Sequence, residues 1–387
     1  MSDLGSVVIG LFQDYGYVGV LLLILILSCF YIEMRYICRG FKLSKYSGKA
    51  DKSEAVANPT ISVLVPLLGE DDRFVTEHLP IILSQRDVKY EVVVIYVGDN
   101  AEFFADMESL KHQHSNLIFK RIELNPQFPM SVKGALNIGI KSAQYDNIIF
   151  TVPEVYPSSQ MWLAAMAKGF VCSEVVLGYS AVEQRAGFEN TFVRSYRLSQ
   201  SLEWLTAAIE DRGYRGVRSN IGFRRELYFM AGGFNNLRLN VGLDDLFFQM
   251  LIREGNTEVV LSPESVVVER VWGGLNWLTD QYRLYNTSFK LYPKSVKSYV
   301  RRERWARFGM FSATIASAFI MPWQFTLLAV VLLLIKWRVQ MSVISAMSKR
   351  VGQQDISMFI PLYDMLSLVY IAFMAIVMMR KDRRAWR

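Results

Sequence analysis

Residues 61–72 read ISVLVPLLGEDD, an apolar run rich in β-branched side chains that leads into a glycine and three acidic residues. Similar apolar runs follow at YEVVVIYV (90–97), LIFKRIEL (117–124) and NIIFTV (147–152). Stretches with helical spacing separate these runs near 73–85, 101–114 and 131–144. This alternation of short strands and helices predicts a mainly parallel sheet that helices cover on both faces. We therefore expect an α/β domain and assign it residues 58–275.

The ends of these strands locate the candidate site, because ligands of such domains bind beyond the carboxyl ends of parallel strands. Pro66, Glu70 and Tyr96 lie close to the first two strand ends, and Glu154 follows the fourth. No strand end carries GxGxxG or GxxxxGK[ST], which excludes the phosphate loops of dinucleotide-binding proteins and P-loop ATPases. Another arrangement of side chains must therefore hold any bound phosphate.

An uncharged stretch at 15–32, YGYVGVLLLILILSCFYI, approaches the ~20 apolar residues that a membrane-spanning helix needs. Asp3 and Asp14 replace the basic start of a cleavable signal peptide, so we expect this helix to be retained. Six cations lie within 35–52, directly after the apolar stretch. The positive-inside rule then places the following domain in the cytoplasm.

Two further apolar runs, 308–335 and 356–379, are long enough to enter a membrane. The first would form about 42 Å of helix, too long for one upright span and too short for two. A tilted or Pro322-kinked span therefore competes with a short hairpin. Asp364, inside the second run, is either an intramembrane functional carboxylate or a residue close to a helix end, and we favour the latter. One span on each side of 336–355 gives three spans in total as the simplest topology, with a basic C-terminal tail in the cytoplasm.

Composition favours a membrane protein over a disordered chain, since 52% of the 387 residues are hydrophobic and 20% are charged. The formal net charge is +7, but the excess of positive charge lies in four segments beside apolar runs: 35–52, 301–307, 336–355 and 380–387. The rest of the chain is net acidic, which argues against a nucleic-acid partner. The three cysteines and three histidines show neither zinc-site spacing nor a disulfide framework.

Several segments, taken in chain order, resemble the membrane-anchored family 2 glycosyltransferases, whose catalytic domain has the Rossmann-like, mainly parallel GT-A fold. They are ISVLVPLLGEDD (61–72), SVKGALNIGIKSA (131–143), FTVPEVYPSSQMWLAAM (150–166) and GVRSNIGFRRELYFMAGGF (216–234), followed by NVGLDDLFFQMLI (240–252). The layout of one N-terminal span, an α/β domain and C-terminal spans also matches that family. The resemblance covers nearly the whole chain and implies transfer of a sugar from a nucleotide-sugar donor.

This resemblance assigns the general base to the acidic pair in LDDLFFQMLIRE (243–254). Asp244 and Asp245 open a predicted helix, where the helix dipole stabilises carboxylates and adjacent side chains point about 100° apart. One of the two can therefore face the site squarely. The family pattern selects Asp245, with Asp244 as its neighbour or as the alternative. A pair of helix N-terminal acids without a catalytic role is the competing interpretation.

The leaving-group side departs from the family pattern. The family's D-x-D aligns with Val152, Pro153 and Glu154, so Glu154 is the carboxylate that remains. Together with donor phosphates, Glu154 would hold Mg²⁺ or Mn²⁺ weakly. The alternative, to which we give equal weight, is that Glu154 is a solvated loop carboxylate without a metal. Tyr96 stands where the family has an aspartate that meets the nucleotide base. It would either stack on the base or belong to the core or its rim.

The helix that matches the family's K-x-x-ALN-x-G pattern contributes Lys133 and Asn137 to the predicted donor site. Lys133 would contact the donor diphosphate, where both its charge and the helix terminus favour an anion. Arg224 is a further candidate on the acceptor and diphosphate side. A solvated cation is the alternative for both Lys133 and Arg224.

WLTDQYRLYNTSFKLY (277–292) lies where processive members of the family carry Q-x-x-R-W. Arg283 is the residue kept in register, and the lack of the tryptophan favours one transfer per acceptor over polymer synthesis. Trp277, Gln281 and Arg283 would lie on the acceptor and diphosphate side. We expect amphipathic helices over 276–307 to lie on the membrane surface.

We therefore expect an inverting, non-processive glycosyltransferase of a bacterial inner membrane that contacts membrane lipids. It would transfer a sugar to a lipid-linked or nascent glycan acceptor at the cytoplasmic face, in polysaccharide or cell-envelope biosynthesis. The residues found at Val152 and Tyr96 support a second hypothesis, an inactive partner or regulatory subunit of a membrane glycan-assembly system. The expected organisation is an N-terminal transmembrane helix (1–36), a basic linker (37–57), a GT-A domain (58–275), interfacial helices (276–307) and a C-terminal transmembrane region (308–387).

Overall fold

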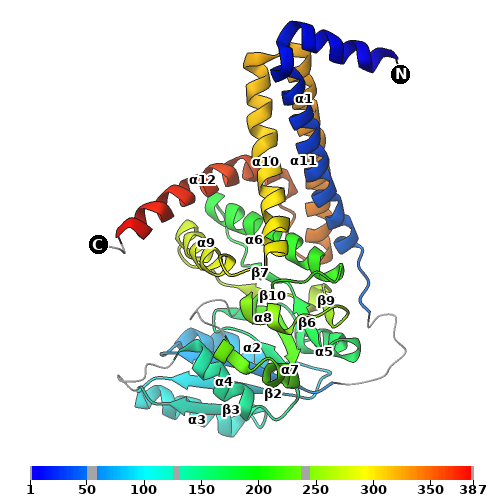
Figure 1. The fold of residues 1–387 in the computed structure, drawn as a ribbon. Helices are drawn as coiled ribbons and strands as arrows, with labels where there is room; N and C mark the ends of the chain where they lie inside the picture. Colours follow the sequence, from blue (N-terminus) through cyan, green and yellow to red (C-terminus); the bar gives the residue numbers. More distant parts are fainter. Residues whose placement is uncertain (1, 50–58, 125–130, 237–244, 385–387) are drawn as a thin grey trace. The chain divides into compact units, whose positions relative to one another are not determined.

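The computed structural model describes residues 2–49, 59–124, 131–236 and 245–384, which form two compact units (Figure 1). The first, called here the α/β unit, comprises Lys45–Leu291 and Ser348–Gln354. The second, called the helical unit, comprises Met1–Ser44, Tyr292–Met347 and Asp355–Arg387. Segment 348–354, which lies between two long helices of the chain, is thus part of the α/β unit.

A seven-stranded sheet with the order β3-β2-β1-β4-β8-β6-β9 forms the centre of the α/β unit. Its strands are β1 (Ile61–Leu68), β2 (Tyr90–Val97), β3 (Leu117–Ile122), β4 (Asn147–Phe150), β6 (Val175–Gly178), β8 (Ile221–Arg224) and β9 (Thr257–Val260). Strands β1 to β4 run parallel, and β8 runs antiparallel to both of its neighbours, β4 and β6. The mainly parallel α/β sheet predicted from the sequence is confirmed.

Helices follow the strands as the alternation predicted. The α/β unit contains α2 (Leu79–Leu83), α3 (Ala101–Gln113), α4 (Val132–Ser142), α5 (Trp162–Cys172), α6 (Phe188–Ile209), α7 (Arg225–Met230), α8 (Leu246–Leu251) and α9 (Leu275–Phe289). A π-helix, η2 (Phe74–His78), leads into α2, and a 3-10 helix, η3 (Arg218–Asn220), leads into β8. The helices predicted near 73–85, 101–114 and 131–144 are therefore confirmed.

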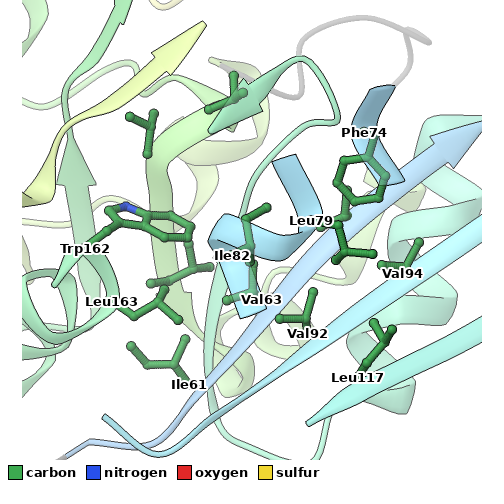
Figure 2. Packing of buried hydrophobic residues seen from close by; sticks show 14 of the residues in the cluster. Ile61, Val63, Phe74, Leu79, Ile82, Val92, Val94, Leu117, Trp162 and Leu163 are labelled. Carbon is green, nitrogen blue, oxygen red and sulfur yellow. The ribbon is translucent and has the colours of Figure 1, made fainter. Parts of the chain in front are cut away.

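Both faces of the sheet are buried, which explains why its strands read as continuous apolar runs rather than as alternating patterns. On one face, Val63 and Val92 belong to a core cluster with Ile82 of α2 and Trp162 of α5 (Figure 2). On the other face, α4 comes so close that a Cβ added to Gly139 would lie 2.6 Å from Cδ1 of Ile95. A glycine therefore permits the close contact between α4 and the sheet.

A smaller sheet in the same unit has the order β5-β10-β7, formed by β5 (Val155–Pro157), β10 (Val267–Glu269) and β7 (Ser180–Val182). Strand β10 runs antiparallel to β5 and parallel to β7. The buried side chain of Asn220 fixes the region between the two sheets. It accepts a hydrogen bond from Trp162 Nε1 at 3.0 Å and donates to the carbonyls of Tyr179 and Ser265, each at 2.9 Å.

The helical unit consists of α1 (Ser2–Ser44), α10 (Lys294–Ile320), the main part of α11 (Trp323–Arg350) and α12 (Ile360–Arg384). Helix α1 bends at Gly16, whose φ of 62° lies in the left-handed region. Ile26 and Cys29 of α1 pack against Met310 and Ala313 of α10 and against Ala329 of α11. Among the described residues, three helical segments are long and apolar enough to cross a membrane: Gly16–Ser44, Trp323–Arg350 and Ser357–Val377.

The uncharged run 308–335 forms parts of two helices, which decides between the kinked span and the hairpin. Helix α10 ends at Ile320, Met321 is extended (φ −114°, ψ 161°), and α11 begins at Trp323. Pro322 explains the break, because a proline removes a helical N–H and disfavours helical geometry at the residue before it. The run therefore turns back at Pro322, as the hairpin alternative predicted, but the two helices extend beyond it: α10 runs without interruption through residues 307 and 308, and α11 continues to Arg350. The expectation that 336–355 separates two spans is therefore wrong for 336–350, which belong to α11.

Asp364 lies in the second turn of α12, near a helix end as expected, but it is buried rather than solvated. Lys336 Nζ lies 2.7 Å from Asp364 Oδ2 and 2.6 Å from Glu33 Oε2, and both Lys336 and Asp364 are 1% exposed. Trp337 Nε1 donates to the same Asp364 oxygen at 3.0 Å, and Arg307 lies 3.6 Å from the other oxygen. Buried charges thus connect α1, α10, α11 and α12.

Candidate functional site

The carboxyl ends of β1, β2 and β4 lie at one edge of the large sheet, where the sequence placed the site. The N–H of Gly69, after β1, donates to the carbonyl of Val97 at the end of β2 at 2.9 Å. The N–H of Thr151, after β4, donates to the carbonyl of Leu64 at 3.1 Å. The turn that carries Glu70 and the turn that carries Glu154 therefore leave the same edge of the sheet.

Tyr96 is a core residue, not a surface for stacking. Its ring is fully buried, with ring centroids 4.9 Å from Phe103 and 6.2 Å from Phe119. Its hydroxyl donates to Glu70 Oε1 at 2.8 Å, and burial, followed by this carboxylate, raises the pKa of Tyr96. The proposed stacking on a nucleotide base is therefore wrong in this structure, because the ring has no open face. Pro66 is likewise buried within β1.

Glu154 lies in the loop between β4 and β5, and two backbone contacts hold that loop. His78 Nδ1 donates to the carbonyl of Pro153 at 2.6 Å, and the N–H of Arg270 donates to the carbonyl of Glu154 at 3.0 Å. Part of the Glu154 side chain is exposed, yet the surrounding protein limits its hydration and raises its pKa. Glu269 adds to this rise in pKa and Arg218 opposes it, so both lie close to Glu154.

A metal site built from protein ligands is not found in the part of the chain that the structure describes, since no three His, Cys, Asp or Glu side chains are grouped to hold an ion. Glu154 supplies a carboxylate at the D-x-D position, where Val152 and Pro153 supply none. The described residues therefore do not fit a cation held by protein ligands alone.

Asp245 is the N-cap of α8, and it is buried, with 4% of its surface exposed. Its Oδ1 accepts a hydrogen bond from the N–H of Leu246 at 2.6 Å, and its Oδ2 accepts one from the hydroxyl of Ser288 in α9. The carboxylate is thus fixed by two elements that lie 43 residues apart in sequence. Asp244 lies outside the described residues.

Helix α9 turns one face inward, which separates the residues predicted for the acceptor side. Ser288 and Tyr285 are buried on this face, and Gln281, seven residues before Ser288, lies on the same side of the helix. Arg283 is about 140° away around the helix axis and pairs with Asp280 at 3.2 Å on a more exposed face. The predicted place of Arg283 on the acceptor and diphosphate side stays a prediction.

Trp277 lies one helical turn before Gln281 and is partly buried. The guanidinium carbon of Arg197 lies 5.1 Å from the centroid of its ring, and Arg197 also pairs with Glu269, the last residue of β10. Trp277 is thus connected to the edge of the small sheet. Its predicted place on the acceptor side stays a prediction.

Arg224 lies at the edge of the large sheet opposite the edge that carries Glu154. In the β4–β8 pairing Arg224 is opposite Asn147, whereas Ile221 is opposite Phe150. Arg224 therefore lies beside the amino end of β4, and Glu154 lies beyond its carboxyl end. The sequence did not show that β8 runs antiparallel, and this reversal brings Arg218, at the other end of the strand, to the site.

Lys133 and Asn137, the residues of α4 that were predicted to bind the donor, follow the N-cap residue Ser131. The hydroxyl of Ser131 accepts from the N–H of Gly134 at 3.3 Å, which leaves Lys133 in the first turn, partly buried. Burial lowers the pKa of Lys133. Asn137 accepts a hydrogen bond from the hydroxyl of Tyr228 at 2.8 Å, so one of its polar atoms serves the contact with α7.

Two residues of this region were missed by the sequence analysis. His78 lies 75 residues from the carbonyl that it binds, and Ser288 lies 43 residues from Asp245. Neither belongs to a recognisable motif, so no local signal in the sequence identifies them. Arg218, in contrast, lies inside the quoted segment 216–234 and was overlooked in favour of the later Arg224.

The sequence matches no protein-family model and no curated protein. The structure is similar to the mannosyltransferase PcManGT from Pyrobaculum calidifontis, solved with GDP-Man and Mn²⁺, with a TM-score of 0.53 and 17% identity, over 91% of this chain and 98% of that one. It is also similar to S. aureus TarS (TM-score 0.42, 16% identity, 76% of this chain and 49% of that one). TarS residues 1–349 with UDP-GlcNAc give 0.37 and 14%, over 75% and 73% of the respective chains.

The likeness to the mannosyltransferase extends over nearly the whole of both chains and exceeds a TM-score of 0.5. The chain therefore has the fold of a glycosyltransferase. It combines that fold with three helical segments that are long and apolar enough to cross a membrane.

Proposed function

We propose that the protein is a membrane-anchored, inverting glycosyltransferase of the GT-A type and of family 2. It would transfer a sugar from a nucleotide-sugar donor to a lipid-linked or nascent glycan acceptor at the cytoplasmic face of the membrane. The observation that carries this proposal is Asp245, a carboxylate that two hydrogen bonds fix at the start of α8 within a glycosyltransferase fold. A carboxylate fixed in this way suits a general base.

In this mechanism, Asp245 takes the proton of the acceptor hydroxyl while that oxygen attacks the anomeric carbon from the face opposite the leaving group. The bonds from Leu246 and Ser288 hold the two carboxylate oxygens in a fixed orientation. The leaving diphosphate would meet Lys133, in the first turn of α4, and Arg218, beside Glu154. Both a cation and a helix N-terminus stabilise the developing negative charge.

A second candidate function is supported by the D-x-D position. Val152 and Pro153 offer no oxygen ligands in their side chains, and the described residues form no metal-ligating group. An inactive glycosyltransferase-like subunit that binds a partner protein would tolerate these losses. The test of the proposed function has to separate these two alternatives.

We expect the detergent-purified full-length chain to release nucleotide from one member of a panel of UDP- and GDP-sugars when a membrane lipid extract supplies acceptors. Nucleotide release and transfer of radiolabel into lipid are measured in parallel, with Mn²⁺, with Mg²⁺ and with chelator. Selective use of one donor supports the enzyme. If no donor is bound or consumed under any of these conditions, the enzyme proposal is wrong and the inactive-subunit alternative replaces it.

Glu154→Gln is expected to abolish any stimulation of this turnover by Mn²⁺, because it removes the carboxylate at the D-x-D position. Since the pKa of Glu154 is raised, protons compete with a metal for this carboxylate at a higher pH than for a free glutamate. The Mn²⁺ concentration for half-maximal activity of the wild type should therefore rise as the pH is lowered towards the raised pKa of Glu154.

Asp72→Asn is the matched control for this experiment, because Asp72 is an exposed carboxylate in the neighbouring turn. Its side chain is not needed by Thr76, whose hydroxyl donates to the backbone carbonyl of Asp72 at 2.8 Å. Titration of Mn²⁺ against initial rate is the measurement. Undiminished Mn²⁺ stimulation in Glu154→Gln contradicts the prediction.

A further inference from the structure

The π-helix η2 connects the turn after β1 with the loop after β4. Its start is fixed by Asp71, whose Oδ1 accepts from the N–H of Phe74 at 2.9 Å and whose carbonyl accepts from the N–H of Val75 at 3.2 Å. The side chain of Phe74 is anchored in the core cluster of the large sheet (Figure 2). Because π-helices are rare and frequently occur at functional sites, the two polar residues at the end of η2, Glu77 and His78, are candidates for a function.

His78 is a buried histidine that uses one of its two ring nitrogens. It is 2% exposed, and its Nδ1 lies 2.6 Å from the carbonyl oxygen of Pro153. Since a carbonyl oxygen can only accept, Nδ1 carries the proton of this hydrogen bond. Among the described residues, nothing bonds to the other nitrogen, Nε2, which is also buried. A buried polar atom without a partner costs free energy, so packing alone does not explain a histidine here, whereas the bond to Pro153 does.

Glu77, the neighbour of His78, supports the same loop through Arg270. Its carboxylate pairs with the guanidinium group of Arg270. The backbone N–H of Arg270 in turn donates to the carbonyl of Glu154 at 3.0 Å. Consecutive residues of η2 therefore hold consecutive carbonyls of the loop: His78 holds that of Pro153 directly, and Glu77 holds that of Glu154 through Arg270.

The ring of Tyr156, two residues after Glu154, contacts both supports. Its centroid lies 5.3 Å from that of the His78 ring, and the guanidinium carbon of Arg270 lies 5.6 Å from it. The hydroxyl of Tyr156 donates to Glu183 at 3.4 Å, and Glu183 also bonds to Arg270 at 3.1 Å. The chain is thus held both before and after Glu154, while part of the Glu154 side chain stays exposed.

We propose that His78 and Glu77 are positioning residues for the transfer reaction, a proposal that rests on the proposed function. They set the place of the Glu154 carboxylate relative to the donor, and His78 does so from a buried position in which it does not touch the donor itself. Without these contacts the loop samples more conformations, and ordering it on donor binding then costs entropy. Their loss is therefore expected to weaken donor binding and to leave the transfer step nearly unchanged.

Two substitutions at His78 separate positioning from packing. His78→Phe keeps a ring that can pack on Tyr156 but removes the donor to Pro153. His78→Asn loses the ring, but its Nδ2 lies as many bonds from Cα as Nδ1 of histidine and can donate to the same carbonyl. A packing role ranks Phe above Asn in every measurement. A positioning role ranks Asn above Phe in loop order and donor affinity, even where the melting temperature follows the opposite order.

Hydrogen–deuterium exchange of the full-length chain in detergent, without donor, measures the order of the loop. We expect the amides of 152–156 and of Arg270 to exchange about three- to tenfold faster in His78→Phe than in the wild type, and His78→Asn to stay within about twofold of the wild type. In parallel, the calorimetric Kd and the KM for the nucleotide sugar should rise about three- to tenfold in His78→Phe, with kcat within about twofold. Glu77→Gln should shift the exchange rate and the donor affinity in the same direction, by about twofold.

His112→Phe and Glu108→Gln are the matched controls, because they change an exposed histidine and an ion pair with Lys111 in α3. Unchanged exchange in His78→Phe would overturn the proposal, and so would equal exchange rates and donor affinities in His78→Phe and His78→Asn. Wild-type donor affinity in a His78→Phe variant whose loop exchanges faster would also overturn it. Failure of the proposed function shows separately, as exchange rates that follow the expected order in a chain that binds no donor.

Discussion

Asp245→Asn is expected to lower kcat roughly 10²–10⁴-fold while leaving donor affinity and folding nearly unchanged, because a general base contributes about this much to a proton transfer. Asparagine is as good an N-cap as aspartate, so its side-chain oxygen can keep the hydrogen bond from Leu246. Its amide can also remain bonded to Ser288. The variant therefore removes the proton acceptor while both of these hydrogen bonds can be kept.

This prediction is checked by the rate of sugar transfer at saturating donor, with donor affinity measured by calorimetry and folding by thermal unfolding. Asp146→Asn is the matched control, since Asp146 is 78% exposed and pairs with Arg225 beside the amino end of β4. We expect this control to keep at least half of the wild-type rate. A transfer rate within about threefold of wild type in Asp245→Asn means that another group is the base.

Lys336→Met is expected to destabilise the protein by about 3–5 kcal/mol, the usual cost of removing one partner from a buried ion pair. Lys336 is 1% exposed and lies within 2.7 Å of Asp364 and 2.6 Å of Glu33. Without its ammonium group, these two nearly buried carboxylates face each other with Arg307 as the remaining cation next to Asp364. The charged groups are left without the interactions that offset their desolvation.

Thermal unfolding of the purified protein in detergent measures this effect. Arg338→Met is the matched control, because Arg338 lies two residues further along α11 and is exposed. Combining Lys336→Met with Glu33→Gln and Asp364→Asn should recover much of the lost stability, since the uncompensated charges are then removed. Equal melting temperatures for Lys336→Met and Arg338→Met would show that the ion pairs contribute little.

The elements of the α/β unit followed from the sequence because burial on both faces leaves a strong local signal. Val92 and Ile95 lie on opposite faces of β2 and are both fully buried, so the strand reads as an unbroken apolar run. The start of α8 could also be predicted from the local sequence, because an aspartate before an apolar segment is typical of a helix N-cap. Asp245 does cap α8, which is short because Ile252 adopts an extended conformation.

The site was harder to predict because its geometry depends on long-range pairing. Arg218 precedes β8 and Arg224 is its last residue. Because β8 runs antiparallel to β4, Arg218 lies towards the carboxyl end of β4, where Glu154 follows, and Arg224 lies beside the amino end of β4. The contacts of His78 with Pro153 and of Ser288 with Asp245 bring together residues that are distant in sequence. The role of Tyr96 could not be predicted for another reason: an aromatic residue at a strand end is compatible both with a buried core position and with a binding surface.

The hydrogen bond from His78 to Pro153 has a consequence for how the D-x-D position can change. The imidazole binds a main-chain carbonyl, which every amino acid possesses, so the clamp is indifferent to the side chain at position 153. The side chain at position 153 can therefore change without loss of this contact, whereas the side chain of Val152 packs against the core cluster of the large sheet. Of the two positions that lack a ligand, position 153 is thus the one at which a carboxylate could be introduced without disturbing either contact.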